Sequence, residues 1–166
     1  MIFQTNDFGV DYVKQDDLSE IVQVYNSNRK FLEAHMNKEK ISEEWILEEL
    51  KSMKEAGFYS CKIVVNSSSK IIGVMDYKLG EETYLSLMML HNNLRGNGIG
   101  QMVFRAFEEY LKSLNSKSIR IDVVTDYDNS VFDFWNKNGF IKCIDVELNW
   151  TGKILSAVTM RKCLTF

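Results

Sequence analysis

The sequence predicts one α+β domain, residues 1–166, in which a mixed, mostly antiparallel sheet is flanked by helices. Three observations lead to this prediction. Segments with the two-residue periodicity of strands alternate with segments of helical periodicity. Three strand-like segments follow one another in the middle of the chain, separated only by short polar turns. Finally, 166 residues, of which 45% are apolar and 26% charged, are typical of one globular domain with a substantial core.

The N-terminal third is predicted to contain one strand and three helices. Ser42 is a typical N-cap for the third helix, and Gly57 is a typical end for it. Glu20 stands three residues after Asp17 and predicts a capping box at the start of the first helix. The predicted elements are a strand at 8–14, a helix that begins at Asp16 or Asp17, a short helix at 29–37 and a helix at 43–56.

The remainder is predicted to alternate strands and helices. The helix at 99–115 connects two strands as a crossover, so the strands at 83–90 and 118–124 should be parallel. The predicted strands are 58–65, 70–79, 83–90, 118–124, 140–148 and 153–163, with a second helix from Asp128 or Asn129 to Lys137. The apolar face of the crossover helix is expected to consist of Ile99, Val103, Ala106, Phe107, Tyr110 and Leu114.

Charge, hydropathy and cysteine content exclude several classes of protein. The net charge is −3 and no basic patch is visible, so we expect no nucleic-acid partner. No apolar run approaches 18 residues and the start lacks a signal-peptide pattern, so we expect neither a membrane span nor a signal peptide. Cys61, Cys143 and Cys163 lie in apolar stretches and predict buried, reduced thiols in a cytoplasmic protein. No spacing of cysteine and histidine suits zinc, so we expect no metal.

The most informative segment is a glycine-rich loop directly before the crossover helix. Gly96, Gly98 and Gly100 lie between Arg95 and Gln101. Glycines allow backbone N–H groups to approach a ligand closely, and a helix N-terminus favours phosphate. Arg95 either adds a charge-assisted contact or braces the loop. The loop therefore predicts an anion site, most simply for a pyrophosphate, although it matches neither the Walker loop nor the dinucleotide-binding GxGxxG pattern.

The string Arg-Gly-Asn-Gly-Ile-Gly from Arg95, after a strand and before an amphipathic helix, resembles the acetyl-CoA loop of the GNAT superfamily of N-acetyltransferases. A second segment, Val131–Phe140, resembles the family's late helix, in which an aromatic residue, three further residues and Gly-Phe follow one another. The resemblance covers 58–164, and the first 57 residues fit the family's variable start less specifically. It implies the GNAT acyl-CoA N-acyltransferase fold, with homodimer formation as a family tendency.

The resemblance also implies which residues contact acetyl-CoA. Backbone groups of Met88, Met89 and Leu90 would bind the pantetheine arm and the acetyl carbonyl, where an N–H stabilises developing oxyanion charge. Asn129, or Asp128 one residue earlier, would fill the position of a cofactor-contacting asparagine. The backbone amides that match the pyrophosphate site are those of Gly96, Asn97, Gly98, Ile99, Gly100 and Gln101, with Arg95 beside them.

The departing thiolate of CoA must gain a proton, and the sequence offers more than one source for it. The family often uses a tyrosine on the late helix, but Trp135 stands at this position and its indole N–H is not a useful acid. Trp135 would then pack beside the pantetheine. Tyr127 is a weak alternative acid, and solvent is another.

A base is needed as well, because an ammonium group must lose a proton before it attacks. In the family the base often lies on the strand that precedes the glycine loop, which makes Glu82 and Tyr84 candidates; Asp76 on the preceding strand is a third. Strand alternation predicts that one face carries Glu82, Tyr84, Ser86 and Met88.

Three functions remain open at this point. The first is transfer of an acetyl group from acetyl-CoA to a primary amine by direct attack in a ternary complex. The second is a regulatory module that binds acyl-CoA without turnover, and the third is an acetyltransferase with a protein acceptor. The acceptor site is expected between the early helices and a hairpin tip at 149–152, where Trp150 either lines the site or packs. The acidic residues of the early helices either attract a cationic amine or form a solvated face.

Overall fold

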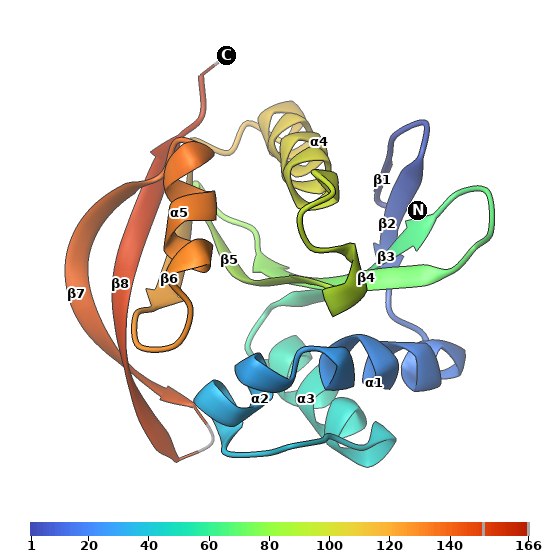
Figure 1. Ribbon diagram of the computed structural model, residues 1–166. Helices are drawn as coiled ribbons and strands as arrows, with labels where there is room; N and C mark the ends of the chain where they lie inside the picture. Colours follow the sequence, from blue (N-terminus) through green and yellow to red (C-terminus); the bar gives the residue numbers. More distant parts are fainter. Residues whose placement is uncertain (151, 166) are drawn as a thin grey trace.

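The computed structural model describes residues 1–150 and 152–165 (Figure 1). Its centre is one eight-stranded sheet with the order β1-β2-β3-β4-β5-β6-β8-β7. The strands are β1 (Phe3–Gln4), β2 (Phe8–Tyr12), β3 (Tyr59–Val65), β4 (Ile71–Lys78), β5 (Glu82–Leu90), β6 (Ser118–Val124), β7 (Ile141–Trp150) and β8 (Lys153–Cys163). The α-helices are α1 (Leu18–Ser27), α2 (Arg29–Met36), α3 (Glu43–Glu55), α4 (Ile99–Ser113) and α5 (Asn129–Lys137). Short 3₁₀ helices are η1 (Gln15–Asp17) and η2 (Asn92–Leu94).

The predicted fold class is confirmed. Strands β5 and β6 are parallel, as expected for strands that the crossover helix α4 connects, and the other neighbouring pairs among the described strands are antiparallel. Each helix and strand expected from the periodicity is present and differs only at its ends. The short strand β1, which pairs with β2, was not predicted because two residues show no periodicity. Part of the predicted hairpin tip, Thr151, lies outside the described residues.

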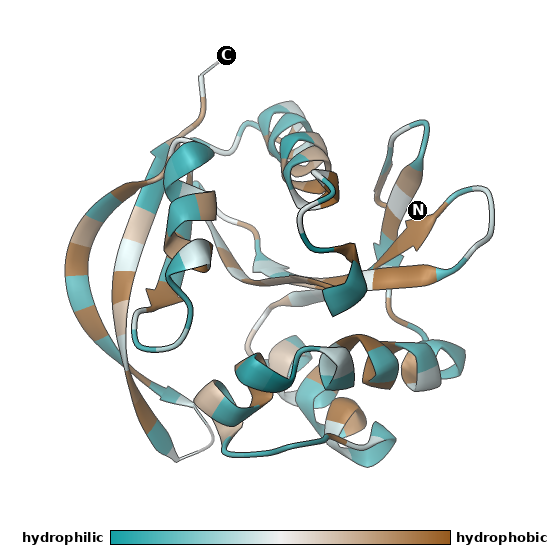
Figure 2. Cartoon of the chain, viewed as in Figure 1, coloured by the Kyte–Doolittle hydropathy of each residue, from teal (hydrophilic) through white to brown (hydrophobic). Residues whose placement is uncertain are grey.

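Helices cover both faces of the sheet (Figure 1). On one face α4 and α5 pack over a core that contains Phe104, Phe107 and Met75, and on the other α1, α2 and α3 pack over a second core with Leu32 and Ile46. Along β7 and β8 hydrophilic and hydrophobic residues alternate, as expected for strands with two different faces (Figure 2). In the described part of the chain, no helix is long and apolar enough to cross a membrane.

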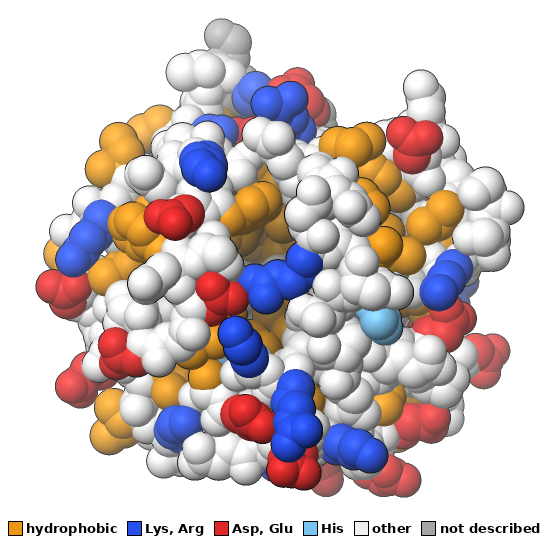
Figure 3. Space-filling view, in the orientation of Figure 1, with side chains coloured by type: hydrophobic (Ala, Val, Ile, Leu, Met, Phe, Trp, Pro, Cys, Tyr) orange, Lys and Arg blue, Asp and Glu red, His pale blue; other side chains and the backbone are white. Residues whose placement is uncertain are grey.

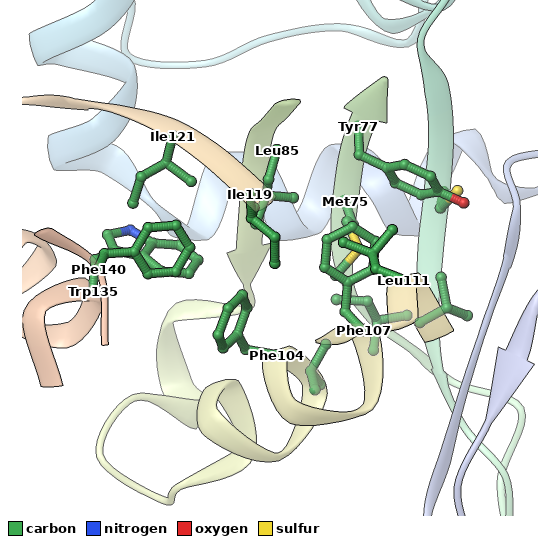
Figure 4. Packing of buried hydrophobic residues seen from close by; sticks show 14 of the residues in the cluster. Met75, Tyr77, Leu85, Phe104, Phe107, Leu111, Ile119, Ile121, Trp135 and Phe140 are labelled. Carbon is green, nitrogen blue, oxygen red and sulfur yellow. The ribbon is translucent and has the colours of Figure 1, made fainter. Parts of the chain in front are cut away.

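Helix α4 buries a slightly different face from the one predicted. Val103, Phe104, Phe107 and Leu111 are fully buried, whereas Leu114 is 46% exposed. The prediction for Leu114 is wrong because the helix ends at Ser113, and the chain turns away at the next residue. Figure 4 shows the buried residues of α4 pointing at the sheet, where the Phe104 ring packs against Trp135 and Phe140.

The capping box predicted at the start of α1 is wrong. Asp17 is the N-cap residue by position, but its carboxylate accepts hydrogen bonds from the Lys14 N–H and the Lys62 ammonium, each at 2.7 Å. The Glu20 carboxylate accepts a hydrogen bond of 3.0 Å from the N–H of Ile71 on β4. Lys62 and Ile71 are brought near these acids by tertiary structure, so local sequence does not reveal either contact.

The prediction of three buried thiols is correct only for Cys61. Cys61 is 1% exposed, and burial raises the pKa of its thiol to about 12. Cys143 and Cys163 are exposed. Cys143 lies on β7, an edge strand whose outer face no described element covers, and Cys163 lies at the end of β8. The prediction failed because apolar neighbours in the sequence do not indicate which face of a strand at the sheet edge is covered by other elements.

Candidate active site

The candidate site is a cleft where the two parallel strands diverge. Pairing between β5 and β6 is limited to the segments Glu82–Tyr84 and Ser118–Arg120, although both strands continue well beyond them. A cleft of about 1180 Å³ opens between the unpaired halves, bordered by both strands, α1, α2, α5 and the glycine loop. Figure 3 shows a hollow with hydrophobic side chains on this face of the molecule.

A β-bulge in β5 contributes to this divergence. The register between β4 and β5 changes from Asp76 opposite Leu87 to Tyr77 opposite Leu85, so that Ser86 is the extra residue. The Ser86 hydroxyl donates a hydrogen bond of 3.2 Å to the backbone carbonyl of Asp76. A bulge bends its strand and increases the local twist. The bend directs the second half of β5 away from β6.

The bulge also reverses the alternation of side chains along β5. Beyond it, Met88 and Leu90 pack against the core beneath α4, and Leu87 and Met89 pack against the core beneath α1 to α3. The prediction that Met88 shares the face of Tyr84 is therefore wrong. An extra residue shifts a period of two by one position, and nothing in the local sequence marks it.

Backbone directions at the end of β5 distinguish the three residues predicted to contact acetyl-CoA. The N–H of His91 donates to the carbonyl of Ile72 on β4 at 2.8 Å. Because N–H groups alternate along a strand, the N–H of Met89 also points to β4. The N–H groups of Met88 and Leu90 point to the opposite side, into the gap between β5 and β6. Two of the three residues therefore present a backbone donor to the cleft.

The end of α1 is attached to the end of β5 by side chains that the sequence analysis missed. Asn28 donates hydrogen bonds of 2.9 Å to the carbonyls of Leu90 and Val24. The Ser27 hydroxyl accepts a hydrogen bond of 2.9 Å from the N–H of Asn92. These contacts hold the edge of the cleft at the point where the strand enters the glycine loop. A Ser-Asn pair at a helix end was the only local signal, and its partners lie more than sixty residues away.

The glycine loop has the backbone geometry of an open anion site. Gly96 has φ = 79° and Gly98 has φ = 75°, a region that side chains with a Cβ rarely adopt. A Cβ added at either glycine would meet no atom within 4 Å. Gly98 is the N-cap of α4, so the first N–H groups of this helix, at Ile99 and Gly100, lack intrahelical acceptors and face outward. The loop thus offers open space and backbone donors to a phosphate.

Two roles were considered for Arg95, a contact with an anion and bracing of the loop, and the structure shows a contact of the bracing kind. Its guanidinium donates to Asp128 at 2.8 Å and to the Ser130 hydroxyl at 3.2 Å, which joins the loop to the start of α5. Asp128 is the N-cap of α5, and hydrogen bonds from Ser130 and Arg95 lower the pKa of its carboxyl to about 2. Asp128 borders the cleft, whereas Asn129 begins the helix and is not among the residues that border it.

Trp135 is mainly a core residue. Its side chain is 7% exposed and meets Phe104, Phe134 and Phe140 edge to face, with ring centroids 4.9 to 5.3 Å apart. One side of the residue still borders the cleft. An indole in this position contributes apolar surface to the cleft rather than a transferable proton.

The predicted catalytic residues occupy different environments. Glu82 lies outside the cleft and forms an exposed ion pair with Arg161 at 2.7 Å. Tyr127 borders the cleft, and burial together with the nearby Asp128 charge raises the pKa of its phenol to about 12. A phenol with a raised pKa releases its proton reluctantly, so it is a weak acid for a thiolate.

Tyr84 borders the cleft, but its hydroxyl already forms a hydrogen bond with a neighbouring side chain. It donates to Asp122 at 3.0 Å, and the same carboxylate accepts hydrogen bonds from Arg120 at 2.9 Å and Thr159 at 2.6 Å. Burial and then the Asp122 charge raise the pKa of Tyr84. A hydroxyl that already donates to a carboxylate is poorly suited to act as a base. The cluster instead braces the strands where they begin to separate.

This bracing role predicts the effect of Tyr84→Phe. We expect the free energy of unfolding to fall by about 1–2 kcal/mol, because a hydrogen bond to a charged group is lost while two others remain. We expect kcat for the acetyl transfer that the sequence resemblance predicts to change less than about threefold. Urea unfolding and steady-state kinetics measure the two effects, with Thr159→Val as the control that removes another donor to Asp122. A fall in kcat of thirtyfold or more in Tyr84→Phe alone would show that the hydroxyl takes part in the reaction.

Asp76 is the predicted base candidate with the most unusual environment. It is 8% exposed and borders the cleft beside the bulge. The pKa of its carboxyl is raised to about 7: burial is the main cause, a hydrogen bond with the Ser60 hydroxyl opposes the rise, and the Glu49 charge adds to it. A carboxyl with a pKa near neutrality is suited to accept a proton at physiological pH.

Aromatic side chains close the end of the cleft beside α2. The Phe31 ring stacks on His35 at 4.0 Å, and His35 meets Trp150 and Tyr127 edge to face at 5.3 and 4.9 Å. Burial lowers the pKa of His35 to about 4, so the imidazole is neutral at physiological pH. The cluster connects α2 to the β7–β8 hairpin. Among residues 1–150 and 152–165, no group of three or more His, Cys, Asp or Glu side chains is arranged to hold a metal ion.

A divergent pair of parallel strands beside a glycine loop at a helix N-terminus is the arrangement that defines the GNAT class of fold, and comparison with known proteins confirms it. Residues 19–140 match the model of the Acetyltransferase (GNAT) family. The chain therefore belongs to this family. No curated protein sequence matches the chain.

Solved structures with similar folds include several N-acetyltransferases. An acetyltransferase from Thermus thermophilus has a TM-score of 0.76 and 17% identity, with 95% of this chain and 97% of that chain covered. Spermidine N-acetyltransferase from Vibrio cholerae, in complex with CoA and spermine, has a TM-score of 0.73 and 13% identity, with 96% and 97% covered. Ribosomal-protein-alanine N-acetyltransferase from Brucella melitensis has a TM-score of 0.68 and 18% identity, with 94% and 99% covered. At these identities the likeness concerns the fold.

Proposed function

We propose that the chain, as a single domain of residues 1–166, transfers the acetyl group of acetyl-CoA to a primary amine by direct attack within a ternary complex. The observation that carries this proposal is the continuity of the cleft between the β5–β6 gap and the glycine loop. A thioester arm fits between the separated strands, while its pyrophosphate lies against the start of α4. The membership of the GNAT family supports the same function.

The loop geometry supports acetyl-CoA as the co-substrate. Gly96 and Gly98 leave open space where any other residue would carry a Cβ, and the N–H groups at the start of α4 face that space. We propose that the amides of residues 96–101 bind the pyrophosphate and that Arg95 holds the loop through Asp128. Of the alternatives for the position at the start of α5, the contacts favour Asp128 over Asn129.

The residues of β5 supply the electrostatic part of catalysis. When bound, acetyl-CoA supplies an activated acyl group whose carbonyl carbon an amine can attack. The N–H groups of Met88 and Leu90, which face the gap, then stabilise negative charge on the carbonyl oxygen. Asn28 keeps the end of the strand in position through the Leu90 carbonyl. Trp135 provides apolar surface, and solvent protonates the leaving thiolate. A cytoplasmic location and a homodimer stay predictions from the sequence.

Two measurements test this function. We expect acetyl-CoA at 100 times its Kd to stabilise the protein by about 2.7 kcal/mol, which a thermal shift assay detects. We also expect thiol release from acetyl-CoA when a panel of small primary amines is added. Absence of any shift at high acetyl-CoA would contradict the proposal. A shift without turnover on amines or on peptide N-termini would favour a non-catalytic acyl-CoA module, and turnover on peptides alone would favour a protein acceptor.

A further inference from the structure

The cleft ends in an acidic recess beside α1 and α3. Tyr25, Glu49 and Asp76 border the large cleft and also line a small cavity of about 20 Å³ directly behind it. A cavity of this size has room for about one water molecule. The three polar side chains come from α1, α3 and β4, so the recess exists only in the folded protein.

The Tyr25 hydroxyl has no protein partner in this recess. Its side chain is 5% exposed, and no described residue forms a hydrogen bond with the hydroxyl. Among the described residues, however, no fully enclosed polar side-chain atom lacks a partner. The hydroxyl therefore opens onto a cavity, where a ligand or a water molecule can reach it. A buried phenol with its polar end open to a cavity is typical of a binding site rather than of a core.

The two carboxyls of the recess also lack a positive partner. No ion pair joins Glu49 or Asp76 to a lysine or arginine in the described part of the chain, although ten other ion pairs are present there. Burial raises the pKa of Glu49 and, more strongly, that of Asp76. Partly buried carboxyls without a cation are costly unless a ligand supplies the charge.

The position of the recess relative to the strand gap is suited to the reaction. Asp76 lies opposite Leu87, one residue before Met88, whose N–H faces the gap between β5 and β6. Met53, one helical turn after Glu49 on α3, and Phe58 also border the cleft and give it apolar surface. An ammonium group in the recess would thus lie beside the strand that polarises the acetyl carbonyl.

We propose that this recess selects a cationic primary amine on an aliphatic chain: Glu49 and the Tyr25 hydroxyl hold the ammonium group, and Asp76 accepts its proton. This inference rests on the proposed acetyl transfer. One ammonium proton passes to the Asp76 carboxylate, directly or through one water, and the freed nitrogen lone pair attacks the carbonyl carbon. The N–C bond forms, and the C–S bond breaks with its electron pair leaving on sulfur. A second nitrogen proton reaches the sulfur through solvent, and Asp76 returns its proton to solvent.

The proposal predicts a pH profile. Asp76 faces Tyr25 from α1, Glu49 from α3 and Cys61 from β3, and none of these groups carries a positive charge. Below about pH 7 the Asp76 carboxyl is protonated and cannot act as a base, so kcat/KM of the wild-type protein should rise with pH through about 7. Above pH 7 the wild-type value should level off, because the carboxylate and the ammonium form of an alkylamine are then both fully present. Asp76→Asn can use only the free amine, so its kcat/KM should keep rising with pH and should not level off.

The stability of Asp76→Asn provides a control for folding. Between about pH 4 and 7 Asp76 keeps its proton in the folded protein but has lost it in the unfolded chain. The contribution of Asp76 to the free energy of unfolding therefore falls as pH rises through this window, because folding then has to bury a carboxylate or take up a proton. A neutral asparagine removes that cost. We therefore expect the melting temperature of Asp76→Asn at pH 8 to be no lower than that of the wild type.

The experiment compares two amines of similar size but different charge, n-propylamine and 2,2,2-trifluoroethylamine, the second being largely neutral at pH 7.5. We expect Asp76→Asn to lower kcat/KM for n-propylamine by at least 100-fold and for trifluoroethylamine by less than tenfold. Glu49→Gln should raise KM for n-propylamine about tenfold with kcat nearly unchanged. The Kd of acetyl-CoA, measured by calorimetry, should stay within twofold of wild type in both variants.

Equal losses on both amines in Asp76→Asn, or a plateau in kcat/KM above pH 7 that persists in this variant, would overturn the role of Asp76. An unchanged KM for n-propylamine in Glu49→Gln would overturn the recess as the ammonium site. Failure of the underlying function is distinguishable, because the wild-type protein would then bind no acetyl-CoA or acetylate neither amine.

Discussion

Replacement of Gly98 by aspartate is expected to raise the Kd of acetyl-CoA roughly 30-fold, or about 2 kcal/mol, whereas Gly98→Asn changes it only a few-fold. Gly98 has φ = 75°, a conformation that asparagine and aspartate tolerate better than other side chains. A Cβ at this position meets no atom within 4 Å, so neither substitution is blocked by the protein itself. The two variants therefore differ mainly by one negative charge at the expected pyrophosphate site.

Calorimetric titration with acetyl-CoA at two salt concentrations measures this effect. The difference between the variants should shrink at high salt, because screening weakens repulsion between charges near the surface. Equal affinities for Gly98→Asp and Gly98→Asn would mean that the pyrophosphate lies elsewhere. The melting temperatures of the free proteins serve as the control for folding of the loop.

The second large effect concerns two leucines near the end of the same helix. Leu111→Ala is expected to lower the free energy of unfolding by about 2–5 kcal/mol, and Leu114→Ala by no more than about 0.5 kcal/mol. Leu111 is 0% exposed beneath α4, so its truncation leaves a cavity in the core. Leu114 is 46% exposed beyond the last helical residue, and the lost methyl groups were already largely in water.

Urea unfolding followed by circular dichroism compares the two variants with the wild type. The slope of free energy against urea should stay constant, because neither substitution changes the surface exposed on unfolding appreciably. Similar losses in both variants would contradict the burial described for α4 and would restore the face predicted from sequence periodicity.

The fold was predictable because its signals are local. Helical and strand periodicity, the Ser42 cap and the Gly57 stop each depend on residues close together in the chain. The parallel pairing of β5 and β6 followed from the crossover helix between them. The glycine loop was also predictable, since the positive φ angles at Gly96 and Gly98 are a property that glycine supplies by itself.

The errors arose where distant segments meet. Whether Cys143 is covered depends on the position of β7 at the sheet edge, and whether Asp17 caps its helix depends on competition from Lys62. The face on which Met88 lies depends on a bulge at Ser86 that forms only against β4. Each of these features depends on a segment that is distant in sequence, so the periodicity of the local sequence cannot predict it.

By itself the sequence determined an α+β sheet, a GNAT-type anion loop and the general location of a cofactor site. Only the tertiary structure decided which candidate groups share the cleft. It separated Glu82, which is paired with Arg161 outside, from Asp76, which is buried beside Glu49 and Tyr25. The physical reason is that a helix start or a glycine turn is formed by residues that are neighbours in the chain. The burial of Asp76, and therefore the pKa of its carboxyl, is instead set by side chains from α1, α3 and β3 that folding brings around this residue.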